Sequence, residues 1–100
     1  MYIFTRIGAR IQGSFGASPK TFSPQAAGAG INAVEVQALT QNVRISFDTT
    51  NNASASEGMQ LKAGDPVKLI VLGGQSFTYQ QEASGAAFYL QPGRLDWVEP

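Results

Sequence analysis

The sequence predicts an all-β fold, a compact antiparallel β-sandwich or a small jelly-roll-like barrel with an extended N-terminal arm. Apolar and polar residues alternate in short runs, turn residues recur at intervals of roughly 8 to 12 residues, and no stretch keeps helical spacing. The 100 residues, 43% of them hydrophobic, suit one domain. We expect residues 1–30 to form the arm and residues 31–100 the β-sandwich domain.

The first thirty residues lack a regular strand or helix pattern, yet they carry apolar side chains throughout. Pro19 and Pro24 disfavour both a helix and a central strand. A disordered tail is normally poor in aromatic and β-branched residues, so these side chains need a cover. We expect another subunit to supply it and residues 31–100 to fold alone. The expected partner-binding anchors are Tyr2, Phe4, Ile7, Ile11, Phe15 and Phe22.

Strand patterns begin after Gly30. The clearest lies at residues 43–48, where Val43, Ile45 and Phe47 alternate with polar residues and should face the core. Strands are also expected at residues 34–38, 59–63, 67–72, 76–80 and 86–91, with a long surface loop at residues 49–58. The strand at residues 67–72 is apolar on both faces, which places it near the middle of a sandwich or under a partner. Pro92 and Gly93 should end the last strand.

Composition excludes several classes of function. Seven Lys and Arg residues balance seven Asp and Glu residues, so no basic field attracts nucleic acid or an anionic membrane surface, and neither is expected as a partner. Without cysteine or histidine, the usual thiol nucleophile, general base and transition-metal ligands are missing. The acidic residues are too scattered for a paired-carboxylate site. We therefore expect no catalytic residue and no cofactor.

Two short motifs favour structural interpretations. Residues 28–33 (GAGINA) match the loose dinucleotide fingerprint, but neither the preceding strand nor the following helix that it needs is predicted. Asp48, Asn52 and Glu57 could offer oxygen ligands to calcium, although their spacing differs from that of an EF-hand loop. Turn hydrogen bonds by Asp and Asn explain these residues without a metal. No metal site is predicted.

The aromatic residues allow two interpretations. A platform that stacks on sugar rings could be built from Tyr2, Phe4, Tyr79, Phe88, Tyr89 and Trp97. Core packing is the default for aromatic residues within strand patterns, such as Phe47, Phe77 and Phe88. Aromatic residues in the terminal segments fit interface anchors better.

Residues 42–50 (NVRISFDTT), a polar loop and residues 58–65 (GMQLKAGD) resemble a segment of small tailed-bacteriophage virion proteins. In that family a V-R-x-x-x-D strand is followed by a T-rich loop and a G-x-x-L-x-A-G turn, and further strands complete a β-sandwich. The resemblance implies a structural role in the virion, as a capsid decoration or cement protein or a minor head or neck component. It implies binding to the major capsid protein or other virion proteins, as a homo-oligomer or on a lattice.

The leading hypothesis is therefore a noncatalytic bacteriophage virion protein that docks through its β domain and arm. The alternative, from a different class, is a carbohydrate-binding module of a phage fibre or secreted protein. That module would use the loop at residues 49–58 and the exposed aromatic residues. An enzyme subunit or inhibitor is a third hypothesis, on which the sequence says little.

Overall fold

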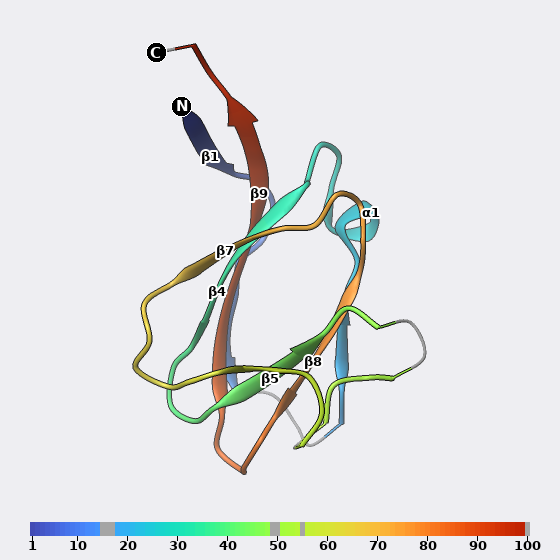
Figure 1. Ribbon diagram of the computed structural model, residues 1–100, viewed down its shortest axis with the longest axis vertical. Coiled ribbons are helices and arrows are strands. Elements are labelled where there is room, and N and C mark those ends of the chain that lie inside the picture. The colour runs from blue at the N-terminus through green and yellow to red at the C-terminus, as the bar shows by residue number, and fades with distance from the viewer. Residues whose placement is uncertain (15–17, 49–50, 55, 100) are drawn as a thin grey trace.

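The computed structural model describes residues 1–14, 18–48, 51–54 and 56–99. Within these ranges, nine strands and one short helix form two antiparallel sheets packed face to face, which confirms the predicted all-β sandwich (Figure 1). The elements are β1 (Tyr2–Arg6), β2 (Ile11–Ser14), β3 (Lys20–Phe22), α1 (Pro24–Ala27), β4 (Ala33–Ala38), β5 (Val43–Ser46), β6 (Met59–Leu61), β7 (Lys68–Val71), β8 (Phe77–Gln81) and β9 (Ala87–Trp97).

The first sheet has the order β1-β9-β4-β7, and the second has the order β3-β8-β5-β6. Strand β2 also pairs with β9, on the side opposite β4. Strands β1 and β2 therefore follow one another along a single edge of β9. β1 pairs with the C-terminal part of β9, and β2 pairs with its N-terminal part. The chain then crosses to the second sheet, where it forms β3.

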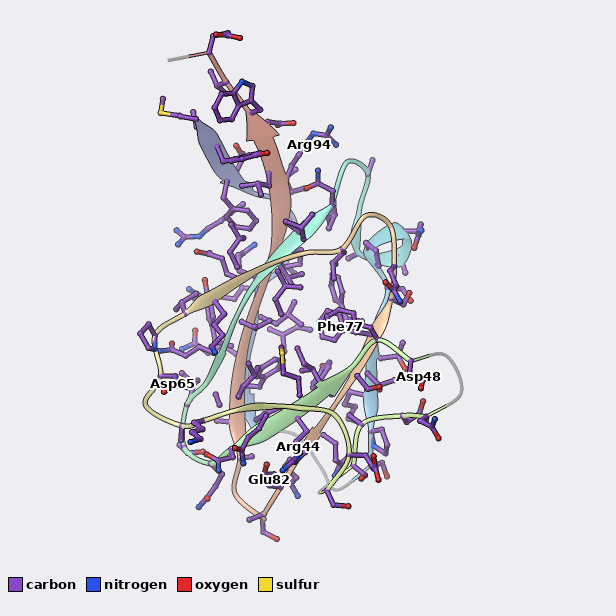
Figure 2. The ribbon with its side chains drawn as sticks, viewed as in Figure 1. Arg44, Asp48, Asp65, Phe77, Glu82 and Arg94 are labelled. Carbon is purple, nitrogen blue, oxygen red and sulfur yellow. The ribbon has the colours of Figure 1, made fainter. Side chains whose placement is uncertain are left out.

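The core lies between the two sheets and contains the inward-facing residues of the central strands. The predicted alternation is confirmed in β4 and β5, where Val34, Val36, Val43 and Ile45 are fully buried. Phe77 of β8 lies in the middle of the molecule, between the sheets (Figure 2). Because these residues come from both sheets, their burial holds the two layers together.

The prediction that residues 1–30 form an extended arm without regular strands is wrong for residues 2–6, 11–14 and 20–22. Three strands from this segment join the same two sheets as the rest of the chain: β1 and β2 pair with β9, and β3 pairs with β8. Phe22 is only 5% exposed, and its ring centroid lies 5.5 Å from that of Phe77. The sandwich therefore supplies part of the cover that was expected from another subunit.

Strand β9 continues through Pro92 and Gly93, which were expected to end it. The carbonyl oxygen of Pro92 accepts a hydrogen bond from the Ile7 amide at 3.0 Å, so the backbone of Pro92 faces the β1 and β2 edge. Pro92 has no amide hydrogen to donate on this side, but it lies between the part of β9 that pairs with β1 and the part that pairs with β2. The ladder with β4, on the other side, loses no bond.

Two further expectations change. Strand β7 is an edge strand of the first sheet and does not lie in the middle of the sandwich.

The loop that follows β5 is mostly exposed where it is described, but Ala53 is fully buried and its amide donates to Thr78 Oγ1 at 2.8 Å. This part of the loop therefore folds over the outer face of β8.

Replacing Phe22 with alanine should lower the free energy of unfolding by about 3 to 5 kcal/mol, because a core ring contributes both burial and packing. Urea denaturation measures the loss. Ile3→Ala, on an exposed part of β1, should change the free energy by less than about 1 kcal/mol. If Phe22→Ala were as stable as wild type, Phe22 would not be a core residue and could again be considered a partner-binding anchor.

Candidate interaction surface

The end of β9 and strand β1 form a two-stranded ribbon that projects from the sandwich. Residues 2–6 pair with residues 93–97, whereas the register of β4 on β9 stops at Gly93 (Figure 1). Residues 2–6 and 93–97 are called the ribbon below. A two-stranded ribbon alone is marginally stable in water, so it needs support at its base or a cover along its faces.

One face of the ribbon carries large apolar side chains. Directly opposed residues of antiparallel strands share a face, which places Tyr2 with Trp97 and Phe4 with Leu95. Tyr2 is 68% exposed and Trp97 is 60% exposed, and their rings meet edge to face with centroids 5.2 Å apart. Exposed apolar groups gathered on one element mark an interaction surface more often than isolated ones do.

The base of the ribbon is packed through Gly93. A Cβ atom at this position would collide with the Phe4 ring and with the Thr5 carbonyl oxygen. The missing side chain therefore lets Phe4 lie close against β9. On the same face, Arg6 Nε donates to Glu35 Oε1 of β4 at 3.1 Å and so links the two neighbours of β9. Because Arg6 is largely exposed, this ion pair contributes little stability.

Asn32 replaces a strand neighbour where β4 stops. Its Oδ1 accepts from the Leu95 amide at 2.8 Å, and its Nδ2 donates to the Leu95 carbonyl oxygen at 3.2 Å. The side chain thus satisfies both backbone groups of one residue of β9, as a paired strand would. The direction of the ribbon is fixed by this contact. The sequence pattern offered no signal for it, because residues 28–33 matched only a loose dinucleotide fingerprint.

The predicted anchors do not form one surface. Tyr2 and Phe4 lie on the apolar face of the ribbon, and Ile7 packs partly against the core. Ile11 is exposed on β2, whereas Phe22 belongs to the core. Phe15 lies outside the described residues. Trp97, a terminal aromatic residue that was expected to fit an interface anchor but was not among the six anchors of the arm, completes the exposed pair with Tyr2.

The sugar-stacking platform is likewise divided. Tyr79 and Phe88 are buried in the core, and the Tyr89 hydroxyl donates to Glu35 Oε1 at 3.3 Å. A separate open hollow of about 240 Å³ lies beside the loop that follows β5. The residues lining it are Thr21, Ser46, Phe47, Asp48, Asn52, Ser76, Phe77 and Thr78.

A polar cluster around Glu82 lies on the second sheet, where β8 ends. Glu82 accepts hydrogen bonds from Gln60 Nε2 at 2.7 Å, from Arg44 Nε at 2.8 Å and from Asn42 Nδ2 at 3.4 Å (Figure 2). The Gln60 bond above all, with the Asn42 bond and the Arg44 charge, holds the pKa of Glu82 below its ordinary value, although partial desolvation opposes the shift. The cluster joins β5, β6 and the end of β8.

No protein-family model, curated protein or solved structure matches the chain. Across the described residues, no helix is long and apolar enough to cross a membrane. In the same part of the chain, no three acidic side chains gather as a group that could hold a metal ion. A functional proposal therefore rests on the surfaces described above.

Asn32→Ala should lower the free energy of unfolding by about 1 to 3 kcal/mol, because two backbone groups of Leu95 lose their partner. Amide exchange of Leu95, followed by NMR, should become faster. Gln25→Ala removes one exposed hydrogen bond to Gly74 and should leave Leu95 exchange unchanged. Unchanged exchange in Asn32→Ala would mean that β1 alone orders this end of β9.

Stability should fall as the pH drops below about 4.5, the ordinary pKa of a glutamate, because Glu82 is protonated more readily in the unfolded chain than in the folded one. The contribution is complete above that pH and is lost as the pH passes through the lowered pKa. Urea midpoints measured across this range should vary less in Glu82→Gln than in wild type. Glu57→Gln, at an exposed loop position, should show the same change of urea midpoint with pH as wild type. An equal change in all three proteins would mean that Glu82 does not cause the loss of stability.

Proposed function

We propose that the chain is a noncatalytic structural protein of a bacteriophage virion and that the ribbon attaches it to the major capsid protein or another virion protein. The observation that carries the proposal is the exposed Tyr2 and Trp97 pair on a projecting element. Tyr and Trp are enriched among the residues that dominate binding energy at protein interfaces. The sandwich then serves as a rigid body whose position on the particle is set by the ribbon.

The support at the base of the ribbon favours attachment. Asn32 and the close contact of Phe4 with Gly93 fix the ribbon before any partner binds. A preformed element loses less conformational freedom on binding than a disordered arm does, so more of the burial of Trp97 and Tyr2 contributes to affinity. The expectation of an extended arm is thus replaced by a proposed docking element that is ordered in the free chain.

The resemblance to tailed-phage virion proteins adds independent support. Its two parts lie side by side as β5 and β6, with Val43 opposite Leu61. Arg44 from the first part donates through Nη1 to the Gly58 carbonyl oxygen of the second at 2.9 Å. The resembling residues therefore make up one paired unit of the second sheet, away from the ribbon.

The test is incorporation into particles. The chain is co-expressed with the capsid proteins of neighbouring genes, and particles are purified on a density gradient. Wild type should sediment with the particles. Combining Tyr2→Ser with Trp97→Ser should weaken incorporation about tenfold or more, because two aromatic anchors are removed. Met59→Ser, at an exposed apolar position of β6, is the matched control and should bind as wild type does. Wild-type protein that stays at the top of the gradient contradicts the virion role.

A carbohydrate-binding module is the second candidate. The hollow beside Asp48 and Asn52 favours it, because amide and carboxylate oxygens can bind sugar hydroxyls. It ranks second because the Phe47 ring packs on Phe77, with centroids 5.5 Å apart, and so does not stand free as a stacking surface. Glycan-array binding that Asp48→Ala abolishes, together with no particle binding, would favour this function over the first.

A further inference from the structure

Strand β7 presents an unusually apolar free edge. Among the described residues, β7 pairs with β4 on one side only. Val67, Leu69 and Val71 are 43%, 45% and 63% exposed. Natural proteins usually protect such edges with short strands or charges; β7 has four residues, one more than β6 at the corresponding edge of the second sheet. Strand β7 carries a single charge, Lys68.

The hydrogen bonds of β4 show which backbone groups of β7 face outward. The Leu72 amide donates to the Asn32 carbonyl oxygen at 2.8 Å. Bonded and non-bonded pairs alternate along antiparallel strands, so Ile70 and Lys68 also direct their backbone groups toward β4. The amides and carbonyls of Leu69 and Val71 are therefore the ones directed to the open edge, and Val67 directly precedes the strand.

This edge is complementary to a second copy of itself. Two antiparallel copies related by a two-fold axis through Leu69 would pair Leu69 with its counterpart and Val67 with Val71. Leu69, Val71 and the adjoining Val67 then gain backbone partners and apolar neighbours. In the same register Lys68 lies opposite Ile70, so no like charges are opposed. The chain has a formal net charge of +0, and long-range repulsion between copies is therefore small.

The neighbouring registers are worse. Centring the axis on Lys68 would place that ammonium group opposite its own copy. Centring it on Ile70 would place Val67 opposite Gly73, whose φ of 58° is not that of an extended strand. Of the three registers, only the one centred on Leu69 pairs the backbone groups of the whole edge without opposing two lysines or including Gly73.

We propose that two copies of this chain associate through β7, antiparallel and centred on Leu69, so that their first sheets join into one. The proposal does not depend on a virion role. A contact along a single short strand is smaller than a standard stable interface, so the association is weak in dilute solution. It becomes strong where many copies are held close together.

Cysteine cross-linking tests the register, because the chain contains no native cysteine. Under mild oxidation Leu69→Cys should form a disulfide-linked dimer, since paired strands bring the two Cα atoms within the roughly 4.4 to 6.8 Å that a disulfide spans. The matched control is Met59→Cys, an exposed residue on the edge of the other sheet. Cross-linking at position 69 should be about tenfold faster than at position 59. Equal rates overturn the proposal.

Sedimentation velocity of the unmodified chain provides a second readout. The sedimentation coefficient should rise with concentration for wild type and for Met59→Lys, but it should stay at the monomer value for Leu69→Lys, in which two like charges would face each other. Thermal unfolding checks that each variant is folded. A folded Leu69→Lys that self-associates as wild type does would contradict the β7 interface. Particle binding is measured separately, so either proposal can fail alone.

Discussion

The continuity of β9 is the constraint on which the rest of the structure depends. This strand is the common neighbour of β1, β2 and β4, so three segments from distant parts of the sequence are placed by one element. Continuity requires that Pro92 be tolerated within a central strand. Pro92 lies between the parts of β9 that pair with β1 and with β2, so its missing amide hydrogen leaves no strand partner without a donor. Gly93, which has no side chain, leaves the space that Phe4 occupies. A substitution with a Cβ at residue 93 would therefore disturb the sheet and the ribbon together.

The sheet and the face on which each strand lies explain why the apolar residues of the N-terminal segment have different roles. Phe22, on β3 of the second sheet, enters the core between the two sheets. Tyr2 and Trp97 lie on the face of the first sheet that also carries Glu35, which points away from the second sheet, and at the end of β9 that projects beyond β4, so both stay exposed (Figure 1). The amide of Asn32 then takes over from β4 as the partner of Leu95. Exposure of the aromatic pair thus follows from its position on the outer face and from the projection of β9 beyond the end of β4.

Local patterns predicted the strands that follow Gly30, the edge strands β6 and β7 included, and failed for β1, β2 and β3. Val34, Val36, Val43 and Ile45 alternate because one face of each strand is buried, and that signal is contained in a few neighbouring residues. The pairing of residues 2–6 joins segments more than eighty residues apart, and no local pattern records it. For the candidate site, Tyr2 and Phe4 were predicted as anchors, but the role of Asn32 depends on where β4 stops pairing and could not be predicted.

The two proposed contacts can be used at the same time because of the strand order. Strands β1 and β7 are the opposite edges of the first sheet, with β9 and β4 between them. A partner that covers Trp97 on the ribbon therefore leaves the edge containing Leu69 free for a neighbouring copy. Each weak edge contact would then be formed among molecules already held in place, where the effective concentration is high. The ribbon would fix each molecule, and the edges would link neighbours without a large interface of their own.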